Sequence, residues 1–562
     1  MKFSQYQYTR PNYEEDRKNF LGIIEEIKNS QSLDEQFQKI QDAHVLRGHI
    51  QTAMTLSSIR YTINTEDKFY KDEKTYWDKT IPLYEEIFFI YNKTLLESPF
   101  KKELEERLSK QFFRLAQLNI KSFSPEVIPE LQEENSLITQ YIELIASAKI
   151  KFMGRELNIS GLTPYTLSHD RELRKMANDI KYDFFKEKEN EIDEIFEELV
   201  KIRDKIAKKL GFKNFVELGY ARMRRTDYNP EMVENFRNQV QKYIVPLASE
   251  LYEKQRKRLE LDELKHYDEK FEFSDGNAIP KGDSNWILEN AKKMYDELSP
   301  ETSEFFSYMI DHELMDLVTK KGKSAGGYCT YIWDYGSPFI FANFNGTSGD
   351  IDVMTHEAGH AFQVYLSRWV GIPGLNCTYE SAEVHSMSME FFTWPWMELF
   401  FKEDTAKYKF THLGGAIKFI PYGVTVDAFQ HFIYENPDAT QSERKSAWRE
   451  LEKKYLPHKN YSESDFLERG GWWFQQAHIF KVPFYYIDYT LAQICALQFW
   501  KNMKDDREGA WQDYINVSNV GGTCSFLELL ERGNIVSPFL DECVPSVIEE
   551  IRKELEILGK NF

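Results

Sequence analysis

Residues 355–360 read Thr-His-Glu-Ala-Gly-His, and this stretch predicts a helix that carries a metal site. Positions i and i+4 lie on one face of a helix, so His356 and His360 can hold a single ion from the same side. Two imidazoles suit Zn²⁺, and the adjacent Glu357 can act as general base toward a water molecule in peptide hydrolysis. Because so short a motif also arises by chance, the flanking sequence has to support it.

The flanks favour a half-buried helix at 351–366. This segment lacks proline and places apolar side chains at Val353, Ala361 and Val364. Ser348 and Asp350, just upstream, are typical of a helix N-terminus. The sequence therefore predicts that the metal motif lies on a helix packed against the core.

A β-hairpin is expected immediately before this helix. Segments 328–333 and 338–344 are rich in aromatic and β-branched residues, and the turn-like 334–337 separates them. An extended peptide can pair with the exposed edge of a strand. We expect strand 338–344 to bind the backbone of a peptide above the metal, which would make cleavage tolerant of sequence.

A third protein ligand should follow, leaving the fourth metal position for water. Segment 378–390 reads as a second helix and offers Glu380, Glu383, Glu390 and His385. Glu380 lies 20 residues beyond His360, the spacing of thermolysin-like enzymes, and Glu383 lies 23 beyond. Spacing alone leaves both carboxylates open as ligands. Methionine and phenylalanine neighbours predict a buried helix, and a buried carboxylate needs a partner such as a metal ion.

Four stretches together resemble the zinc oligopeptidases, the family of thimet oligopeptidase, and most closely bacterial oligoendopeptidase F and Pz-peptidase. They run in the family's order over about residues 320–490. The stretches are Gly-Lys-Ser-Ala-Gly-Gly-Tyr-Cys at 322–329; 341–347 followed by the motif at 355–360; Glu383 with Glu390; and His478 followed by Pro-Phe-Tyr-Tyr-Ile-Asp-Tyr at 483–489.

The resemblance implies a choice among the acidic residues. Glu383 matches the family's third zinc ligand, and Glu390 is expected behind it as a partner for a ligating imidazole. Glu380 becomes the second choice. His385 lies off the ligand face, and we expect it to have a structural or substrate-side role.

The aromatic segment 470–489 has two readings. Most aromatic residues belong to a core, so packing is the plain explanation. The chemical explanation is that neutral donors stabilise the oxyanion formed beside the metal. The resemblance implies that His478, Tyr486 and Tyr489 face the scissile bond, with Tyr485 as an alternative to Tyr486. The loop after His478 is one residue shorter than in the thimet branch, and Val482-Pro483 stands where that branch has glycines and a tyrosine.

Composition limits the partners and the compartment. The net charge of −20 argues against nucleic acid and against an anionic membrane surface as partners. No apolar run is long enough to span a membrane, and the N-terminus lacks the apolar region of a signal peptide. Five scattered cysteines without a C-x-x-C pair indicate reduced thiols, so we expect a cytoplasmic protein.

The periodicity elsewhere predicts a mainly α protein with one small β-sheet beside the zinc helix. We expect an N-terminal helical domain at 1–190 and a catalytic domain at 191–562. The charged stretch 250–272 is expected to form an exposed helix pair. The resemblance implies a deep channel between the two parts that admits short unfolded peptides. Further helices are expected at 13–29, 33–63, 68–96, 101–118, 191–210, 443–455, 484–501 and 544–558.

These observations predict a zinc-dependent oligoendopeptidase that hydrolyses internal bonds of short peptides. One Zn²⁺ per chain would be held by His356, His360 and Glu383. Two rivals stay open: a helical peptide-binding protein with a structural metal, completed by His385 or Glu380, and a secreted thermolysin-like protease that uses Glu380. The oligomeric state and the cleavage preference are not encoded in any motif.

Overall fold

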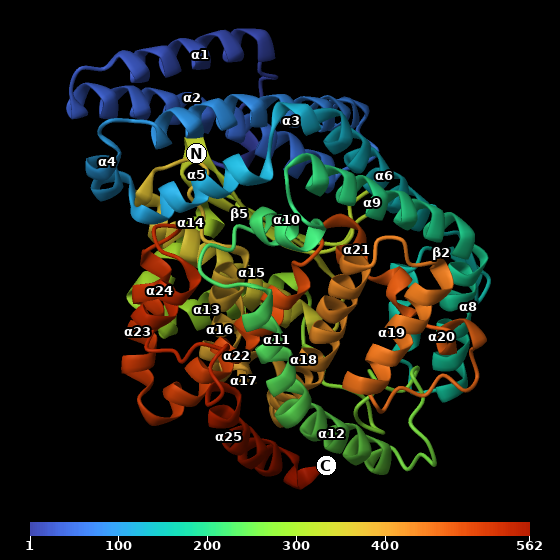
Figure 1. Ribbon diagram of the computed structural model, residues 1–562. Helices are drawn as coiled ribbons and strands as arrows, with labels where there is room; N and C mark the ends of the chain where they lie inside the picture. Colours follow the sequence, from blue (N-terminus) through green and yellow to red (C-terminus); the bar gives the residue numbers. More distant parts are fainter.

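The structure is a computed structural model that describes residues 1–562, with the side chain of residue 561 left out. It is built mainly of α-helices with one small sheet beside the motif helix, so the predicted fold class is confirmed. Figure 1 shows the N-terminal helices as a layer over the remaining helices. That layer contains α1 (Tyr13–Asn29), α2 (Leu33–Ile63), α3 (Lys68–Leu96), α4 (Lys101–Leu108) and α5 (Lys110–Ser122).

The predicted single helix at 101–118 is wrong, because two helices meet at Ser109. This residue has a φ of 95° and interrupts the helical backbone. Its hydroxyl accepts a hydrogen bond from the Phe112 amide at 3.2 Å and so caps the start of α5. A serine that caps one helix can thus divide a segment whose periodicity looks continuous.

The charged stretch 250–272 is also not the predicted exposed helix pair. Helix α12 (Val245–Arg258) ends early, and residues 259–283 form turns and irregular backbone. Asp268 is fully buried and is paired with Arg171 and Arg174 from a distant helix. The Gln255 amide donates to backbone carbonyls of the same loop. Tertiary ion pairs therefore draw this charged stretch into the interior.

The predicted hairpin is present as β4 (Tyr328–Ile332) and β5 (Ser337–Phe344), which pair antiparallel. A third strand, β3 (Met315–Val318), was not predicted and pairs parallel with β5. The order β3-β5-β4 makes β5 the central strand. The expectation that strand 338–344 pairs with a peptide is therefore wrong, because both of its edges are occupied. The free edge beside the motif belongs to β4.

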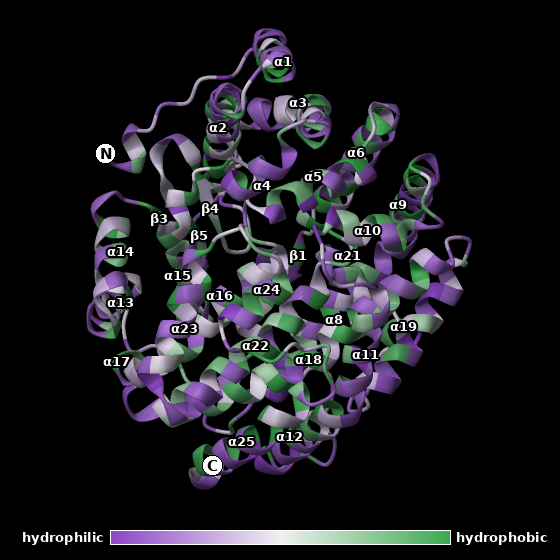
Figure 2. Ribbon diagram, turned by 60° about the vertical axis from the view of Figure 1, so that its left-hand side comes forward, coloured by the Kyte–Doolittle hydropathy of each residue, from purple (hydrophilic) through white to green (hydrophobic). Residues whose placement is uncertain are grey.

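The motif lies on α15 (Gly349–Ser367), which packs against α16 (Tyr379–Phe392). Gly359 makes this close packing possible, because a Cβ there would lie 2.7 Å from the Ser386 Cα and 2.8 Å from the His385 carbonyl oxygen. Long helices α18 (Thr405–Glu435) and α22 (Tyr486–Asp505) complete the centre of the molecule. Figure 2 shows hydrophobic residues on these central helices, whose buried side chains belong to the largest hydrophobic cluster, while the N-terminal helices build a second one.

The other helices and the second sheet surround this centre. No described helix is long and apolar enough to cross a membrane. The domain boundary between residues 190 and 191 stays a prediction. The remaining elements are α6 (Ile128–Ala146), β1 (Ile150–Phe152), β2 (Arg155–Leu157), α7 (Thr163–Thr166), α8 (Arg171–Glu187), α9 (Glu189–Lys209), α10 (Phe215–Arg222), α11 (Pro230–Gln239), α13 (Ser284–Leu298), α14 (Pro300–Asp311), α17 (Glu398–Phe401), α19 (Gln441–Tyr455), α20 (Asp465–Glu468), α21 (Ala477–Lys481), α23 (Arg507–Asn519), α24 (Phe526–Arg532) and α25 (Cys543–Leu558).

Candidate active site

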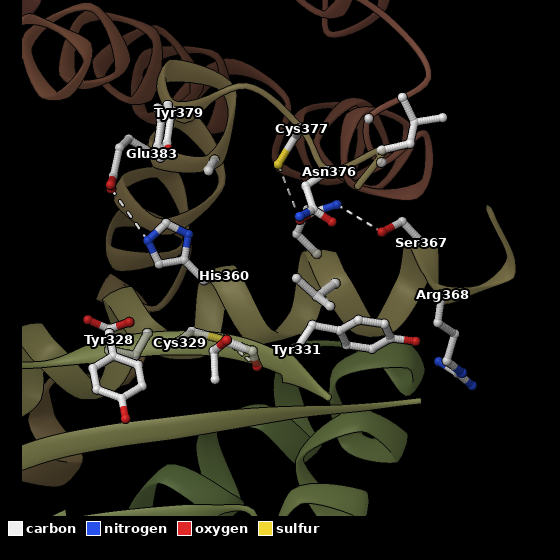
Figure 3. A pocket seen from close by; sticks show the side chains of 18 of the residues that line it. Tyr328, Cys329, Tyr331, His360, Ser367, Arg368, Asn376, Cys377, Tyr379 and Glu383 are labelled. Atoms are coloured by element: carbon white, nitrogen blue, oxygen red, sulfur yellow. Dashed lines mark hydrogen bonds and ion pairs between the residues drawn. The ribbon is translucent and has the colours of Figure 1, made fainter. Parts of the chain in front are cut away.

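Three donor side chains converge where α15 meets α16. The ligand atoms of His356, His360 and Glu383 all lie within 4.8 Å of one another. Glu383 Oε2 lies 3.2 Å from His356 Nε2 and 3.4 Å from His360 Nε2. Figure 3 shows the His360 imidazole turned toward Glu383. Two ring nitrogens and one carboxylate oxygen form a donor set that fits Zn²⁺ and leaves a coordination position open.

Each carboxylate oxygen of Glu383 also accepts a hydrogen bond from a hydroxyl group. Tyr485 donates its hydroxyl to Glu383 Oε1 at 2.5 Å, while Ser386 donates to Oε2 at 2.9 Å. Burial opposes ionisation of Glu383, yet the adjacent His360 and His356 hold its pKa well below the usual range. Glu383 is therefore a carboxylate oriented toward the two imidazoles.

Glu380 precedes Glu383 by three residues on α16, yet its carboxyl group is not part of this cluster. It is 1% exposed, and within the described part of the chain neither of its carboxyl oxygens has a hydrogen-bond partner. Burial, together with repulsion from Asp488, raises the pKa of Glu380 to about 8. The three-donor group contains Glu383 and not Glu380.

A network behind His356 fixes the orientation of its ring. His356 Nδ1 is 2.7 Å from Glu390 Oε1, and Glu390 Oε2 is 2.7 Å from Nε2 of His412 on α18. Trp394 donates its indole N–H to His412 Nδ1 at 3.2 Å, which leaves the Nε2 proton of His412 for Glu390. Such an outer carboxylate sets the tautomer and basicity of a ligating imidazole.

Sequence reasoning missed His412 and Trp394. His412 lies 22 residues beyond Glu390 in a helix without a recognisable motif. A histidine on a helix with apolar neighbours is normally read as a core residue. Only the tertiary structure, which brings His412 on α18 to α16, reveals its contact with Glu390.

Glu357 lies beside the ligand cluster and faces the same pocket. Its side chain is almost fully buried, and among the described residues its Oε2 atom has no hydrogen-bond partner. Burial raises the pKa of Glu357. A carboxylate with a raised pKa and a free oxygen suits proton transfer near neutral pH.

The pocket at this centre has a volume of about 400 Å³. One wall is the edge strand β4, which contributes residues 328–331, and another is the loop 371–377 that leads to α16. Figure 3 shows Tyr328, Cys329 and Tyr331 along this strand, below His360. An extended peptide could therefore pair with β4 while lying across the ligand cluster.

The three tyrosines after His478 occupy different positions. Tyr485 and Tyr489 line the pocket, and their ring centroids are 4.8 Å apart. Tyr486 is not among the described residues that line it, and its ring packs against His478, Phe419 and Tyr422. Burial raises the pKa of all three phenols, so each hydroxyl keeps its proton at neutral pH.

His478 is a neutral imidazole whose tautomer is set by its neighbours. The Tyr422 hydroxyl donates to the side-chain oxygen of Gln476 at 2.6 Å, and the side-chain N–H of Gln476 then donates to His478 Nδ1 at 2.7 Å. The ring proton is therefore on Nε2. Burial lowers the pKa of His478 to about 4. The side chain is thus a neutral N–H donor at physiological pH.

His385 does not reach the pocket. It is fully buried, its Nδ1 is 3.3 Å from the Ser518 hydroxyl, and its carbonyl accepts from Tyr514. Burial lowers the pKa of His385 to about 3. These contacts support a structural role rather than a substrate-side one.

This arrangement, a His-His-Glu donor cluster with a neighbouring carboxylate and an edge strand, is that of a metallopeptidase. The sequence pattern of Peptidase family M3 matches residues 165–544, and that of the Peptidase M3 N-terminal domain matches residues 3–123. The chain belongs to Peptidase family M3 and is a metal-dependent peptidase acting on peptides.

Individual relatives agree with this assignment. The solved structure of Pz peptidase A with an inhibitor is 54% identical, covers 99% of both chains and superimposes with a TM-score of 0.96. A chain from Bacillus anthracis strain Ames, provisionally named oligoendopeptidase F, is 53% identical over 99% of this chain and 98% of its own, with a TM-score of 0.92. The oligoendopeptidase F homolog of Borreliella burgdorferi is 24% identical over 416 residues, 70% of this chain and 68% of that protein.

Proposed function

We propose that the protein is a zinc-dependent oligoendopeptidase that hydrolyses internal bonds of short, unstructured peptides. The observation that carries the proposal is the convergence of His356, His360 and Glu383 beside Glu357 at one pocket. Their geometry accommodates one Zn²⁺ per chain with an open position. A closed structural site would need a fourth protein ligand, and the described residues offer only these three within the cluster.

The residues around the pocket have distinct proposed roles. When bound, zinc would polarise the scissile carbonyl and lower the pKa of a coordinated water. Glu357 takes a proton from the attacking water and passes it to the leaving amine. Tyr489, which lines the pocket, donates a hydrogen bond to the developing oxyanion together with His478, whose ring centroid lies 5.9 Å from that of Tyr489 but which is not among the lining residues. Tyr485 is favoured over Tyr486 as a further donor because Tyr485 lines the pocket, and its hydroxyl would then release Glu383 Oε1.

Substrate binding is proposed to use the free edge of β4. Backbone pairing along residues 328–332 would hold a peptide in an extended conformation with little dependence on its sequence. Pairing with this edge needs an extended segment, which an unstructured peptide supplies. We propose the cytoplasm as the compartment, because all five cysteines are free thiols.

Hydrolysis of a quenched peptide series of increasing length, with and without a chelator, tests this function. We expect cleavage of short internal bonds that is lost with the chelator and restored by zinc. The Glu357→Gln variant should retain zinc and lose roughly 10²- to 10⁴-fold in kcat. Full turnover by that variant, or by the chelated enzyme, would contradict the proposal.

A further inference from the structure

A second cavity, the α2–α3 pocket, borders the same strand as the active-site pocket. It has a volume of about 440 Å³, within the range of cavities that hold small ligands. Its walls are formed by residues of α2 and α3 together with Tyr328, Cys329 and Thr330 of β4. The same three strand residues also line the active-site pocket. The two cavities therefore meet at the free edge of β4.

The two cavities lie on opposite faces of this strand. Successive side chains of a strand point to alternate faces of the sheet. Gly327, just before β4, faces α15, because a Cβ there would lie 3.3 Å from Glu357 Oε1. Tyr328 and Thr330 share the other face, where the Tyr328 hydroxyl is 2.6 Å from the Thr62 hydroxyl on α2. The catalytic groups are thus on one side of the strand edge, and the α2–α3 pocket is on the other.

The surface inside the α2–α3 pocket is mostly apolar. Ile59 and Trp77 are almost fully buried and belong to two different hydrophobic clusters. Met54 and Ile81 line the same cavity and are only half-buried. The pocket is therefore a gap at the boundary between the two clusters, and its free apolar surface would be covered by an apolar occupant.

The charged residues of this pocket neutralise each other. Lys74 and Asp78, one turn apart on α3, pair at 2.5 Å. The other described residues that line the pocket are uncharged. A charged ligand would lose its hydration here without gaining a partner of opposite charge. The pocket therefore favours a neutral side chain.

An extended peptide that pairs with β4 would continue the alternation of the sheet. Its side chains would point in turn toward α15 and toward the helices α2 and α3. Gly327, beside Glu357, and residues 328–330 place both cavities at the same level along the strand. A side chain that enters the α2–α3 pocket therefore belongs to a residue near the scissile bond.

We propose that the α2–α3 pocket is a specificity site that binds an apolar side chain, such as leucine or phenylalanine, of a peptide residue within two positions of the scissile bond. The inference rests on the proposed peptidase function and deepens it. Backbone pairing with β4 holds the peptide in an extended conformation, and this pocket adds one preferred side chain. The protein should cleave peptides of varied sequence with a preference at a single position.

Cleavage of quenched peptide series by the zinc-loaded enzyme tests the proposal. Each series varies one position near the scissile bond among leucine, phenylalanine, serine, glutamate and lysine, and mass spectrometry identifies the cleaved bond. At one position we expect kcat/KM to be roughly 10- to 100-fold higher for leucine or phenylalanine than for serine. Cleavage with equal rates for apolar and polar residues at every position would overturn the specificity site and leave the peptidase function standing.

Peptide binding to the Glu357→Gln enzyme separates the two proposals in the opposite case. If the wild-type enzyme cleaves no peptide, the labelled leucine and serine peptides are compared for binding to this variant. Tighter binding of the leucine peptide would mean that the peptidase function fails while the apolar site stands. Equal binding would overturn both.

Breaking the Lys74–Asp78 pair assigns the preference to this pocket. Asp78→Asn leaves Lys74 unpaired and should raise the relative kcat/KM of the glutamate peptide roughly 2- to 5-fold at the preferred position. Lys74→Gln leaves Asp78 unpaired and should do the same for the lysine peptide. A structural disturbance alone would not give opposite shifts at one peptide position. The absence of both shifts would assign the preference to another part of the molecule and overturn the proposal.

Lys292 and Asp296 form the matched control pair. They also lie one turn apart, pair at 2.5 Å and are partly exposed, but they belong to α13 and line neither cavity. Asp296→Asn and Lys292→Gln should leave the relative rates of all peptides as they are in the parent. Shifts equal to those of the α3 variants would mean that the overall charge of the protein sets the preference, which would contradict the proposal.

Discussion

Helix α16 carries two glutamates, three residues apart, in opposite protonation states. Glu383 faces two imidazoles, which hold its pKa well below the usual range. At Glu380, burial and the Asp488 carboxylate raise the pKa to about 8. Both side chains are almost fully buried. The charge of the neighbours, rather than burial, therefore decides which carboxylate is available to a metal.

Removing each glutamate in turn gives the largest expected effect. Glu383→Gln should lose bound zinc and essentially all activity, because it replaces a ligand oxygen. Glu380→Gln should keep one zinc per chain, since it changes a group that is already protonated. Mass spectrometry of the native proteins measures the metal content. Equal zinc loss in both variants would remove the distinction between Glu380 and Glu383.

The tyrosines that follow His478 provide the next test of this site. We expect Tyr485→Phe to lower kcat by roughly 10²-fold, the typical cost of removing one oxyanion donor, and Tyr486→Phe to have a smaller effect. Steady-state kinetics at saturating zinc separates kcat from KM. If Tyr486→Phe is the more damaging change and raises KM little, the packed ring of Tyr486 must turn toward the substrate.

The network behind the ligands should matter less than the ligands themselves. His412→Ala removes the hydrogen bond to Glu390 Oε2 and should weaken zinc binding by roughly 10- to 100-fold, the usual range for an outer partner. Competition with a chelator of known affinity measures this. Trp394→Phe, which removes only the indole donor to His412, serves as the milder companion variant.

Glu380 is expected to give the smallest effect, visible in the pH dependence of stability. Its pKa is about 8 in the folded protein and 4.5 in the unfolded chain, so the folded state binds more protons between these values. Its contribution to stability is fully present below pH 4.5 and is lost as the pH rises through 8. Glu380→Gln should therefore flatten the decline of the apparent Tm over this window. An unchanged pH profile would show that Glu380 is ionised in the native protein.

Local sequence predicted the parts of the site that depend on short-range geometry. The i, i+4 spacing placed His356 and His360 on one helical face, and the aromatic runs 328–333 and 338–344 predicted the hairpin. The break at Ser109 and the burial of the 259–272 loop were not predicted. The break at Ser109 is a local cap that the periodicity did not reveal, whereas the burial of the loop depends on Arg171 and Arg174, far away in the chain.

The sequence by itself determined the helical class, the donor types and the spacing that allows a two-histidine metal site. Spacing left Glu380 and Glu383 equivalent, and it offered no reason to consider His412. The packing of α22 against α16, and the contact of His412 on α18 with Glu390, decided those questions. The physical reason is that helix periodicity fixes where a side chain points, whereas its charge state and partners depend on which distant elements pack around it.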